Sequence, residues 1–150
     1  KMEKLAVIKI RTDIGKNKAI KDGLRVLGLK KLYSCVILDN SPQNKGILNI
    51  IDSVVTYGEI DAKTLSKLLL KRGRISNKKK MEAKEQDINS FSESFLKGEK
   101  KIADLGIKNL FNLHPPIKGF ERKGKKAPFS LKGSFGYRGD KINELLNRMI

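Results

Sequence analysis

The sequence has no tryptophan, one cysteine (Cys35) and one histidine (His114) in 150 residues. A single cysteine forms no internal disulfide, which is typical of proteins in a reducing compartment. One cysteine and one histidine also fall short of the four ligands that a zinc site usually has. We therefore expect no metal and no other cofactor. Cys35 lies in an apolar run, and we interpret it as a small buried side chain.

Long apolar runs and enzyme motifs are missing as well. No run approaches the roughly 20 apolar residues of a membrane-spanning helix, and no signal-peptide pattern follows the N-terminal lysines. No Walker loop, nucleophile elbow, H-E-x-x-H or paired-cysteine motif occurs. These absences predict a soluble cytoplasmic protein that is not an enzyme and has neither a membrane partner nor a small-molecule substrate.

Acidic side chains are scarce relative to basic ones. The chain has 33 Lys and Arg against 16 Asp and Glu, which gives a formal net charge of +17. Residues 61–81 carry a net charge of +7 and residues 114–138 carry +6, whereas residues 82–113 carry −1. Charge concentrated in two segments indicates a surface that meets phosphates, so we expect RNA or DNA as the partner.

The first sixty residues alternate between strand and helix patterns. Apolar alternation predicts a strand over 5–11, and a helix with an apolar stripe follows and ends at Gly28. A second strand is expected over 33–39, a second helix is capped by Ser41, and a third strand covers 55–60. The second helix is expected to bury Ile47, Ile50, Ile51 and Val54. This β-α-β-α-β order predicts an α+β sheet with helices on one face.

The later part of the chain reads mainly as helices joined by basic segments. Asp61 is expected to cap a helix that ends near residue 73, and a basic connector follows over 72–80. Apolar spacing predicts a further helix over 82–96 and a short terminal helix over 140–150. Residues 105–113 form an apolar cluster for which both a short helix and a strand remain open.

A glycine-rich basic loop occupies residues 114–139, with five glycines and three prolines. Such a segment cannot build a core of its own, so we expect it to become ordered on binding. Four aromatic rings are interleaved with its charges and can stack on unpaired bases: Phe120, Phe129, Phe135 and Tyr137. Packing onto the domain is an equal alternative for Phe129 and Phe135. His114 either faces RNA or packs internally.

Several short motifs together resemble one protein family. Residues 23–31, Asp39 with Pro42, and Gly46-Ile47 are similar to the ribosomal protein L30 family of the large subunit, whose eukaryotic counterpart is called L7; this match covers residues 4–60. Further motifs resemble the archaeal and eukaryotic extension of that family, and they lie at residues 55–58, 70–73, 113–116, 133–139 and 142–145. The archaeal type is favoured because the chain lacks the long basic N-terminal arm of the eukaryotic form.

This resemblance implies a three-stranded antiparallel sheet with two helices on one face, of the ferredoxin-like kind. It implies a core domain over residues 1–60 and an extension of helices and a basic loop over 61–150. It also implies a structural constituent of the large ribosomal subunit that binds ribosomal RNA near the base of the central protuberance, with other ribosomal proteins as possible neighbours. The alternative is a free RNA- or DNA-binding regulator outside the ribosome.

Charge pattern and resemblance together predict three groups of RNA-binding residues. The first group covers the end of the first strand, the loop and the first helix: Arg11, Lys16, Lys18, Lys21, Arg25, Lys30 and Lys31. The second group follows the basic connector: Arg72, Arg74, Lys78, Lys79 and Lys80. The third group belongs to the glycine-rich loop: His114, Lys118, Phe120, Arg122, Lys123, Lys125, Lys126, Lys132, Tyr137 and Arg138. Basic side chains of this kind neutralise phosphates and release counterions, so binding should weaken as salt rises.

Overall fold

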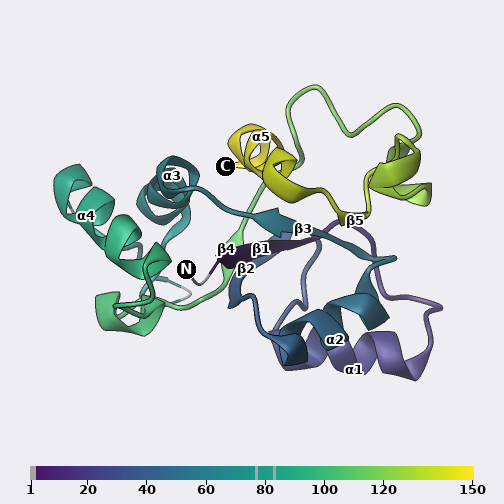
Figure 1. Cartoon of the computed structure of the whole chain (residues 1–150), viewed down its shortest axis with the longest axis horizontal. Helices are drawn as coiled ribbons and strands as arrows, with labels where there is room; N and C mark the ends of the chain where they lie inside the picture. The colour runs from purple at the N-terminus through teal and green to yellow at the C-terminus, as the bar shows by residue number, and fades with distance from the viewer. Residues whose placement is uncertain (1–2, 77, 83) are drawn as a thin grey trace.

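The computed structural model of the chain describes residues 3–76, 78–82 and 84–150. One sheet lies at its centre, with strands in the order β4-β2-β1-β3-β5 (Figure 1). The strands are β1 (Lys4–Lys9), β2 (Ser34–Asp39), β3 (Val55–Glu59), β4 (Phe111–Asn112) and β5 (Gly136–Tyr137). β1 pairs with β2 and with β3 in antiparallel fashion, β4 adds to β2 antiparallel, and β5 adds to β3 in parallel.

The described residues form five α-helices around this sheet, and short 3-10 turns in the second half of the chain. The helices are α1 (Lys18–Leu27), α2 (Pro42–Ile51), α3 (Ala62–Arg72), α4 (Glu85–Leu96) and α5 (Ile142–Met149). The 3-10 turns are η1 (Ile102–Leu105), η2 (Gly124–Lys126), η3 (Phe129–Leu131) and η4 (Gly139–Lys141). None of the described helices is both long and apolar enough to cross a bilayer.

Side-chain caps fix where the helices begin. Ser41 accepts the N–H of Asn44 at α2, and Asp61 accepts the N–H of Thr64 at α3, so both predicted caps are confirmed. Gly28 ends α1 in the left-handed conformation with φ 77°, as a C-terminal glycine should. The predicted α+β class, with three central antiparallel strands and two helices on one face, is confirmed. β4 and β5 are additions from the second half of the chain.

The sheet is covered on both faces, with α1 and α2 below it and α3 and α5 above it in the view of Figure 1. Leu5 and Val7 of β1 belong to the apolar core shared with α1 and α2. Ala6 and Ile8 of the same strand belong to the core formed with α3, α4 and α5. Because neighbouring strand residues point to opposite faces, β1 lies at the centre of both cores. Cys35 is fully buried, and burial raises its thiol pKa to about 12, so it packs as an inert apolar group.

Some element details differ from the sequence-based predictions. Ile50 is 51% exposed, whereas Leu48 is fully buried, because Leu48 and Ile51 lie on the side of α2 that meets the sheet. The undecided stretch 105–113 contains the strand β4, and the 3-10 turn η1 ends at its first residue. Gly23 lets α1 approach α2, since a Cβ there would lie 2.7 Å from Cγ2 of Ile51.

Candidate nucleic-acid interface

The structure brings the first and second predicted groups together at one hollow of about 360 Å³. It is lined by Gly28, Lys30, Lys31, Ser34, Arg74, Ser76, Lys108, Leu110 and Asn112. Four of these residues carry positive charge, and of the described residues that line the hollow none is acidic. We call this feature the cationic hollow. Its charges come from three chain segments, and together they favour an anion.

Local hydrogen bonds explain how the cationic hollow is built. Gly28 turns the chain sharply at the end of α1 and leaves Lys30 and Lys31 exposed in the following loop. Arg74 forms a bridge with Lys80, so the basic connector folds back on itself. The main-chain N–H of Lys108 donates to the carbonyl of Arg74 at 3.0 Å and fixes the third segment against the connector.

The predicted RNA-binding residues divide by exposure. Most are exposed: Lys18, Lys21, Arg25, Lys30, Lys31, Arg74, Lys78, Lys79, Lys80, Lys118, Arg122, Lys123, Lys126, Lys132 and Tyr137. Six are half-buried: Arg11, Lys16, Arg72, His114, Phe120 and Lys125. Arg138 is buried. Arg11 donates to the carbonyl of Ser53 at 3.3 Å, and Nε of Arg72 is buried without a hydrogen-bond partner among the described residues.

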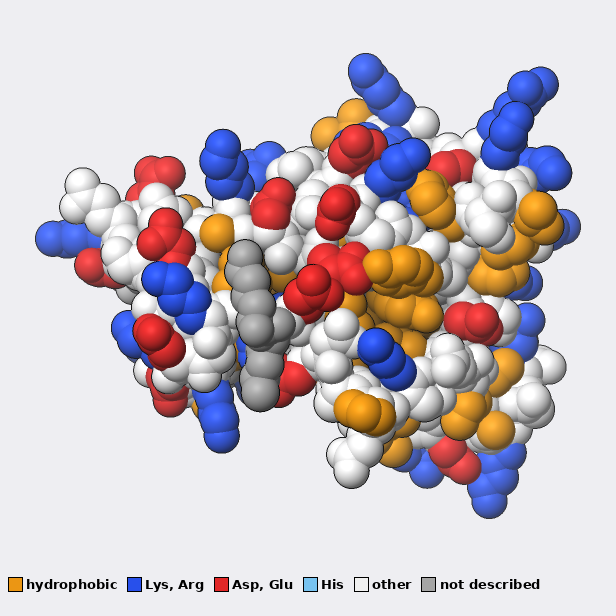
Figure 2. All heavy atoms as spheres, in the orientation of Figure 1, with side chains coloured by type: hydrophobic (Ala, Val, Ile, Leu, Met, Phe, Trp, Pro, Cys, Tyr) orange, Lys and Arg blue, Asp and Glu red, His pale blue; other side chains and the backbone are white. Residues whose placement is uncertain are grey.

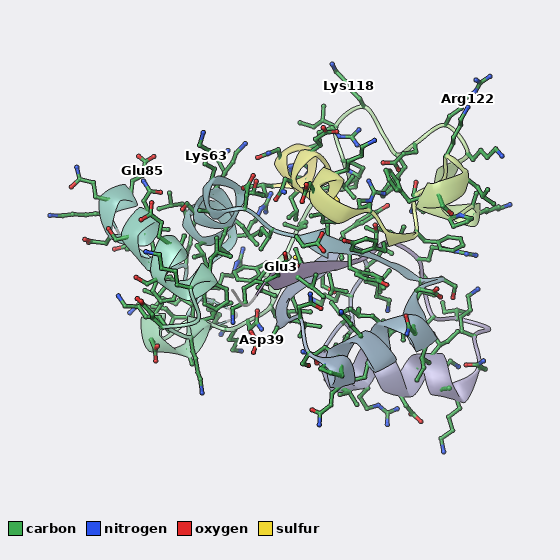
Figure 3. The ribbon with its side chains drawn as sticks, in the orientation of Figure 1. Glu3, Asp39, Lys63, Glu85, Lys118 and Arg122 are labelled. Carbon is green, nitrogen blue, oxygen red and sulfur yellow. The ribbon has the colours of Figure 1, made fainter. Side chains whose placement is uncertain are left out.

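The glycine-rich loop presents a second basic surface. Lys118 and Arg122 project away from the body of the protein (Figure 3). Arg122, Lys123 and Lys132 line a second hollow together with Ser130 and Leu131. Lys118 and Lys132 have positive φ angles of 68° and 66°, which non-glycine residues seldom adopt. The loop is thus tightly turned where its lysines are displayed.

Phe120 and Lys125 contact the protein itself. The Phe120 ring lies 6.2 Å from the ring of Tyr33, and Nζ of Lys125 lies 5.0 and 5.2 Å from the centres of the Tyr33 and Phe120 rings. Lys125 also donates to the Tyr33 hydroxyl at 2.8 Å. These contacts join the glycine-rich loop to the loop that carries Lys30 and Lys31. Both residues therefore serve the packing of the interface, although the sequence suggested RNA crevices for them.

His114 also follows the packing alternative. Its Nε2 lies 2.9 Å from the carbonyl oxygen of Ile150, and its Nδ1 lies 2.7 Å from that of Pro115. The main-chain N–H of His114 donates to Met149 at 3.1 Å. The residue therefore connects the start of the glycine-rich loop to the end of α5.

Arg138, which the sequence assigned to RNA binding, has its guanidinium occupied by partners inside the protein. Arg138 is 4% exposed. Its Nε donates to Thr56 Oγ1 at 2.7 Å, and its Nη1 and Nη2 donate to the carboxylate of Glu121 at 2.6 and 3.2 Å. Nη2 also donates to the carbonyl of Ser134 at 2.7 Å. The Phe129 ring lies 4.7 Å from the guanidinium carbon.

This Arg138 network holds the glycine-rich loop against the sheet. Glu121 comes from the start of the loop, Ser134 from its end, and Thr56 from β3. Ser134 Oγ donates to Glu121 at 2.7 Å, and Thr56 Oγ1 donates to the carbonyl of Gly136 at 3.0 Å. The chain itself thus supplies the interactions that shape the loop, whereas the sequence-based expectation assigned that role to binding.

The network predicts a specific loss of stability in acid. Burial alone would raise the pKa of Glu121, but hydrogen bonds from Arg138 and Ser134 outweigh it and hold the pKa below the ordinary value of 4.5. The unfolded chain therefore binds a proton first, and the stabilisation by Glu121 is lost as pH falls below 4.5 and through the folded-state pKa. We expect the free energy of unfolding to fall less steeply in that range for Glu121→Gln than for the unaltered chain. Urea denaturation at several pH values measures this free energy. If it falls equally steeply with pH in both proteins, the role assigned to Glu121 is contradicted.

Lys108 is the member of the cationic hollow that sequence reasoning missed. It lies in residues 82–113, whose net charge is −1, so charge counting gave no reason to select it. No local sequence pattern predicts that Lys108 lies at the hollow either. It reaches the hollow because β4 pairs with β2 and brings residues 108–112 beside Ser34.

The sequence matches one protein family over part of its length and is similar to individual members over nearly all of it. Residues 5–55 match the family model described as ribosomal protein L30p/L7e. Large ribosomal subunit protein uL30 of Methanococcus maripaludis is 40% identical over 151 residues, which cover 97% of this chain and 98% of that protein. The uL30 proteins of Nanoarchaeum equitans and Archaeoglobus fulgidus are 39% and 36% identical and cover 97% and 96% of this chain, with 97% and 98% of those proteins covered.

Proposed function

The chain belongs to the ribosomal protein L30p/L7e family, and on this premise we propose that it holds large-subunit ribosomal RNA through its cationic hollow and its glycine-rich loop. As a member of the archaeal type it is a structural constituent of the large ribosomal subunit in the cytoplasm, and it is not an enzyme. The family assignment does not support the alternative of a free regulator. The RNA contacts proposed below refine its role within the subunit.

The observation that carries this proposal is the convergence of positive charge at the cationic hollow. Lys30 and Lys31 lie more than forty residues from Arg74 in the sequence, and Lys108 is more distant still, yet all line one depression. A cluster of positive charges attracts anions, and the RNA backbone supplies closely spaced phosphates. The hollow would therefore bind the backbone, and the released counterions would favour binding at low salt.

The two parts of the chain would divide this work. Residues 1–60 would form the core domain that supplies the sheet, α1 and the lysines after Gly28. Residues 61–150 would form the extension that supplies the basic connector and the glycine-rich loop. The Tyr33–Lys125 contact and the Arg138 network support this view, because they fix the loop relative to the core. A rigid arrangement loses little conformational entropy on binding.

A charge-neutralising pair of substitutions tests the cationic hollow. We expect Lys30→Gln/Lys31→Gln to weaken binding to a large-subunit ribosomal RNA fragment, and to reduce the slope of log K against log salt by about 1 for each phosphate that the variant no longer neutralises. Both lysines are exposed, so the fold should not change. Filter binding or fluorescence anisotropy at several salt concentrations measures the effect.

The matched control is Lys84→Gln/Lys97→Gln, which removes the same charge at the two ends of α4, where both lysines are exposed. We expect this variant to lose less affinity and to keep the salt slope. If both variants lose affinity and slope equally, only the total charge matters, and the cationic hollow is not an RNA site.

A further inference from the structure

Three carboxylates lie at the same end of the three central strands, although they are far apart in the sequence. Glu3 precedes β1, Asp39 ends β2 and Glu59 ends β3. The antiparallel register places Lys4 opposite Asp39 and Leu5 opposite Glu59, so the three carboxyl groups lie at the same end of neighbouring strands. Figure 3 shows Glu3 near the middle of the view and Asp39 below it.

A groove with an aromatic wall lies beside these carboxylates. We call it the tyrosine groove, and it is lined by Leu5, Asn40, Lys45, Asn49, Tyr57, Glu59 and Tyr137. The rings of Tyr57 and Tyr137 lie 5.5 Å apart at an angle of 49°. Tyr137 is 54% exposed, so its ring is accessible to a binding partner. In Figure 2 acidic and hydrophobic side chains adjoin at the centre of this face, while Lys and Arg project around its rim.

The local charge at the tyrosine groove is opposite to that of the whole protein. The Tyr137 hydroxyl donates to Glu59 at 2.5 Å, and this hydrogen bond, burial and the charges of Glu59, Glu3 and Asp140 raise the pKa of Tyr137 to about 12. Of the described residues that line the groove, Lys45 is the one with positive charge. Glu59, Glu3 and Asp140 thus give this part of the surface more negative than positive charge, on a chain whose net charge is +17.

We propose that the tyrosine groove docks an extended, arginine-rich segment of a neighbouring protein in the large ribosomal subunit. A phosphate backbone would have to approach several carboxylates here, which is electrostatically unfavourable. An arginine fits both components of the site, because its planar guanidinium binds carboxylates in bidentate fashion and stacks on aromatic rings. The groove therefore complements a basic peptide, whereas the cationic hollow complements RNA.

Titration with a model peptide tests this docking. The probe is a ten-residue peptide of alternating Arg and Gly, added to the full-length 15N-labelled protein and followed by NMR and calorimetry. We expect chemical-shift changes confined to the groove, centred on Leu5, Tyr57 and Tyr137. The protein carries a net charge of +17, so general attraction cannot cause the binding.

Two variants locate the binding and separate it from RNA binding. Glu3→Gln/Asp140→Asn removes two exposed carboxylates beside the groove and should weaken peptide binding about tenfold, since two exposed charge pairs with the peptide are lost. Glu93→Gln/Glu99→Gln removes two exposed carboxylates elsewhere and should leave peptide binding nearly unchanged. Tyr137→Leu should weaken peptide binding through loss of the aromatic ring, while the carboxylates stay in place.

The affinity for the ribosomal RNA fragment is measured on the same variants. It should be unchanged or slightly higher for Glu3→Gln/Asp140→Asn, because negative charge has been removed. A loss of RNA affinity in this variant would make the groove an RNA site and overturn the proposal. Equal peptide affinity in the groove and control variants would overturn it as well. Neither of these two results bears on the cationic hollow, which is tested separately with the lysine variants.

Discussion

Replacing Arg138 with methionine should lower the free energy of unfolding by about 3 kcal/mol, the lower end of the usual cost of breaking a buried ion pair, because Glu121 is half-buried. Four hydrogen bonds from the guanidinium are lost, and Glu121 keeps only Ser134 as a partner within this network. A typical domain has a free energy of unfolding of only about 5–15 kcal/mol, so this substitution should remove a large part of it. Urea denaturation at neutral pH measures the loss.

The matched control for this prediction is Arg122→Met. Arg122 lies in the same loop but projects into solvent, so its removal should change stability by no more than about 0.5 kcal/mol. The Arg138→Met/Glu121→Leu double variant should lose less than the sum of the two single variants, because the remaining charge is then removed as well. A stability loss below about 1 kcal/mol for Arg138→Met would contradict the structural role of this residue.

Replacing Gly133 with alanine should also destabilise the protein strongly, by about 3 kcal/mol, at the upper end of the range for overpacking. A Cβ at this position would overlap the main-chain carbonyl and the Cβ of Ala127. The two segments of the turn cannot move apart without losing hydrogen bonds. The N–H of Ser134 donates to the carbonyl of Ala127 at 2.9 Å, and the N–H of Gly133 donates to that of Pro128 at 2.9 Å. The Arg138 network would be disturbed too, since it includes the carbonyl of Ser134.

Gly46→Ala provides the comparison, because it adds the same methyl group where nothing lies within 4 Å of the new Cβ. Gly46 is an exposed residue inside α2, so alanine should stabilise the chain by about 0.5–1 kcal/mol. Thermal and urea unfolding of the two variants should therefore move in opposite directions. Two variants of equal stability would show that the turn at Gly133 is not tightly packed.

The fold was largely predictable because its signals are local. The apolar alternation of β1, the caps at Ser41 and Asp61, and the glycine after α1 each act within a few residues. Ile50 was assigned to the wrong side of α2 because isoleucines at neighbouring positions leave the helical phase ambiguous. β4 and β5 have two residues each, and they exist only through pairing with β2 and β3.

The functional surface was predictable as a charge excess but not as a set of positions. Arg122 and Arg138 occur in the same basic segment, yet one is exposed and the other is enclosed by Thr56, Glu121 and Ser134. Sequence spacing carries no information on this difference, because the partners of Arg138 lie 4 to 82 residues away. The same limit applies to Phe120 and Lys125, whose partner Tyr33 belongs to a distant loop.

The amino-acid sequence alone determined the class of fold, the excess of positive charge and the inert character of Cys35. These properties follow from periodicity, composition and nearest neighbours along the chain. Only the tertiary structure decided that Lys108 joins Lys30 at one hollow, and that Glu3, Asp39 and Glu59 lie at the same end of the three central strands. Strand register and helix packing set these distances, and both depend on contacts between residues far apart in the sequence.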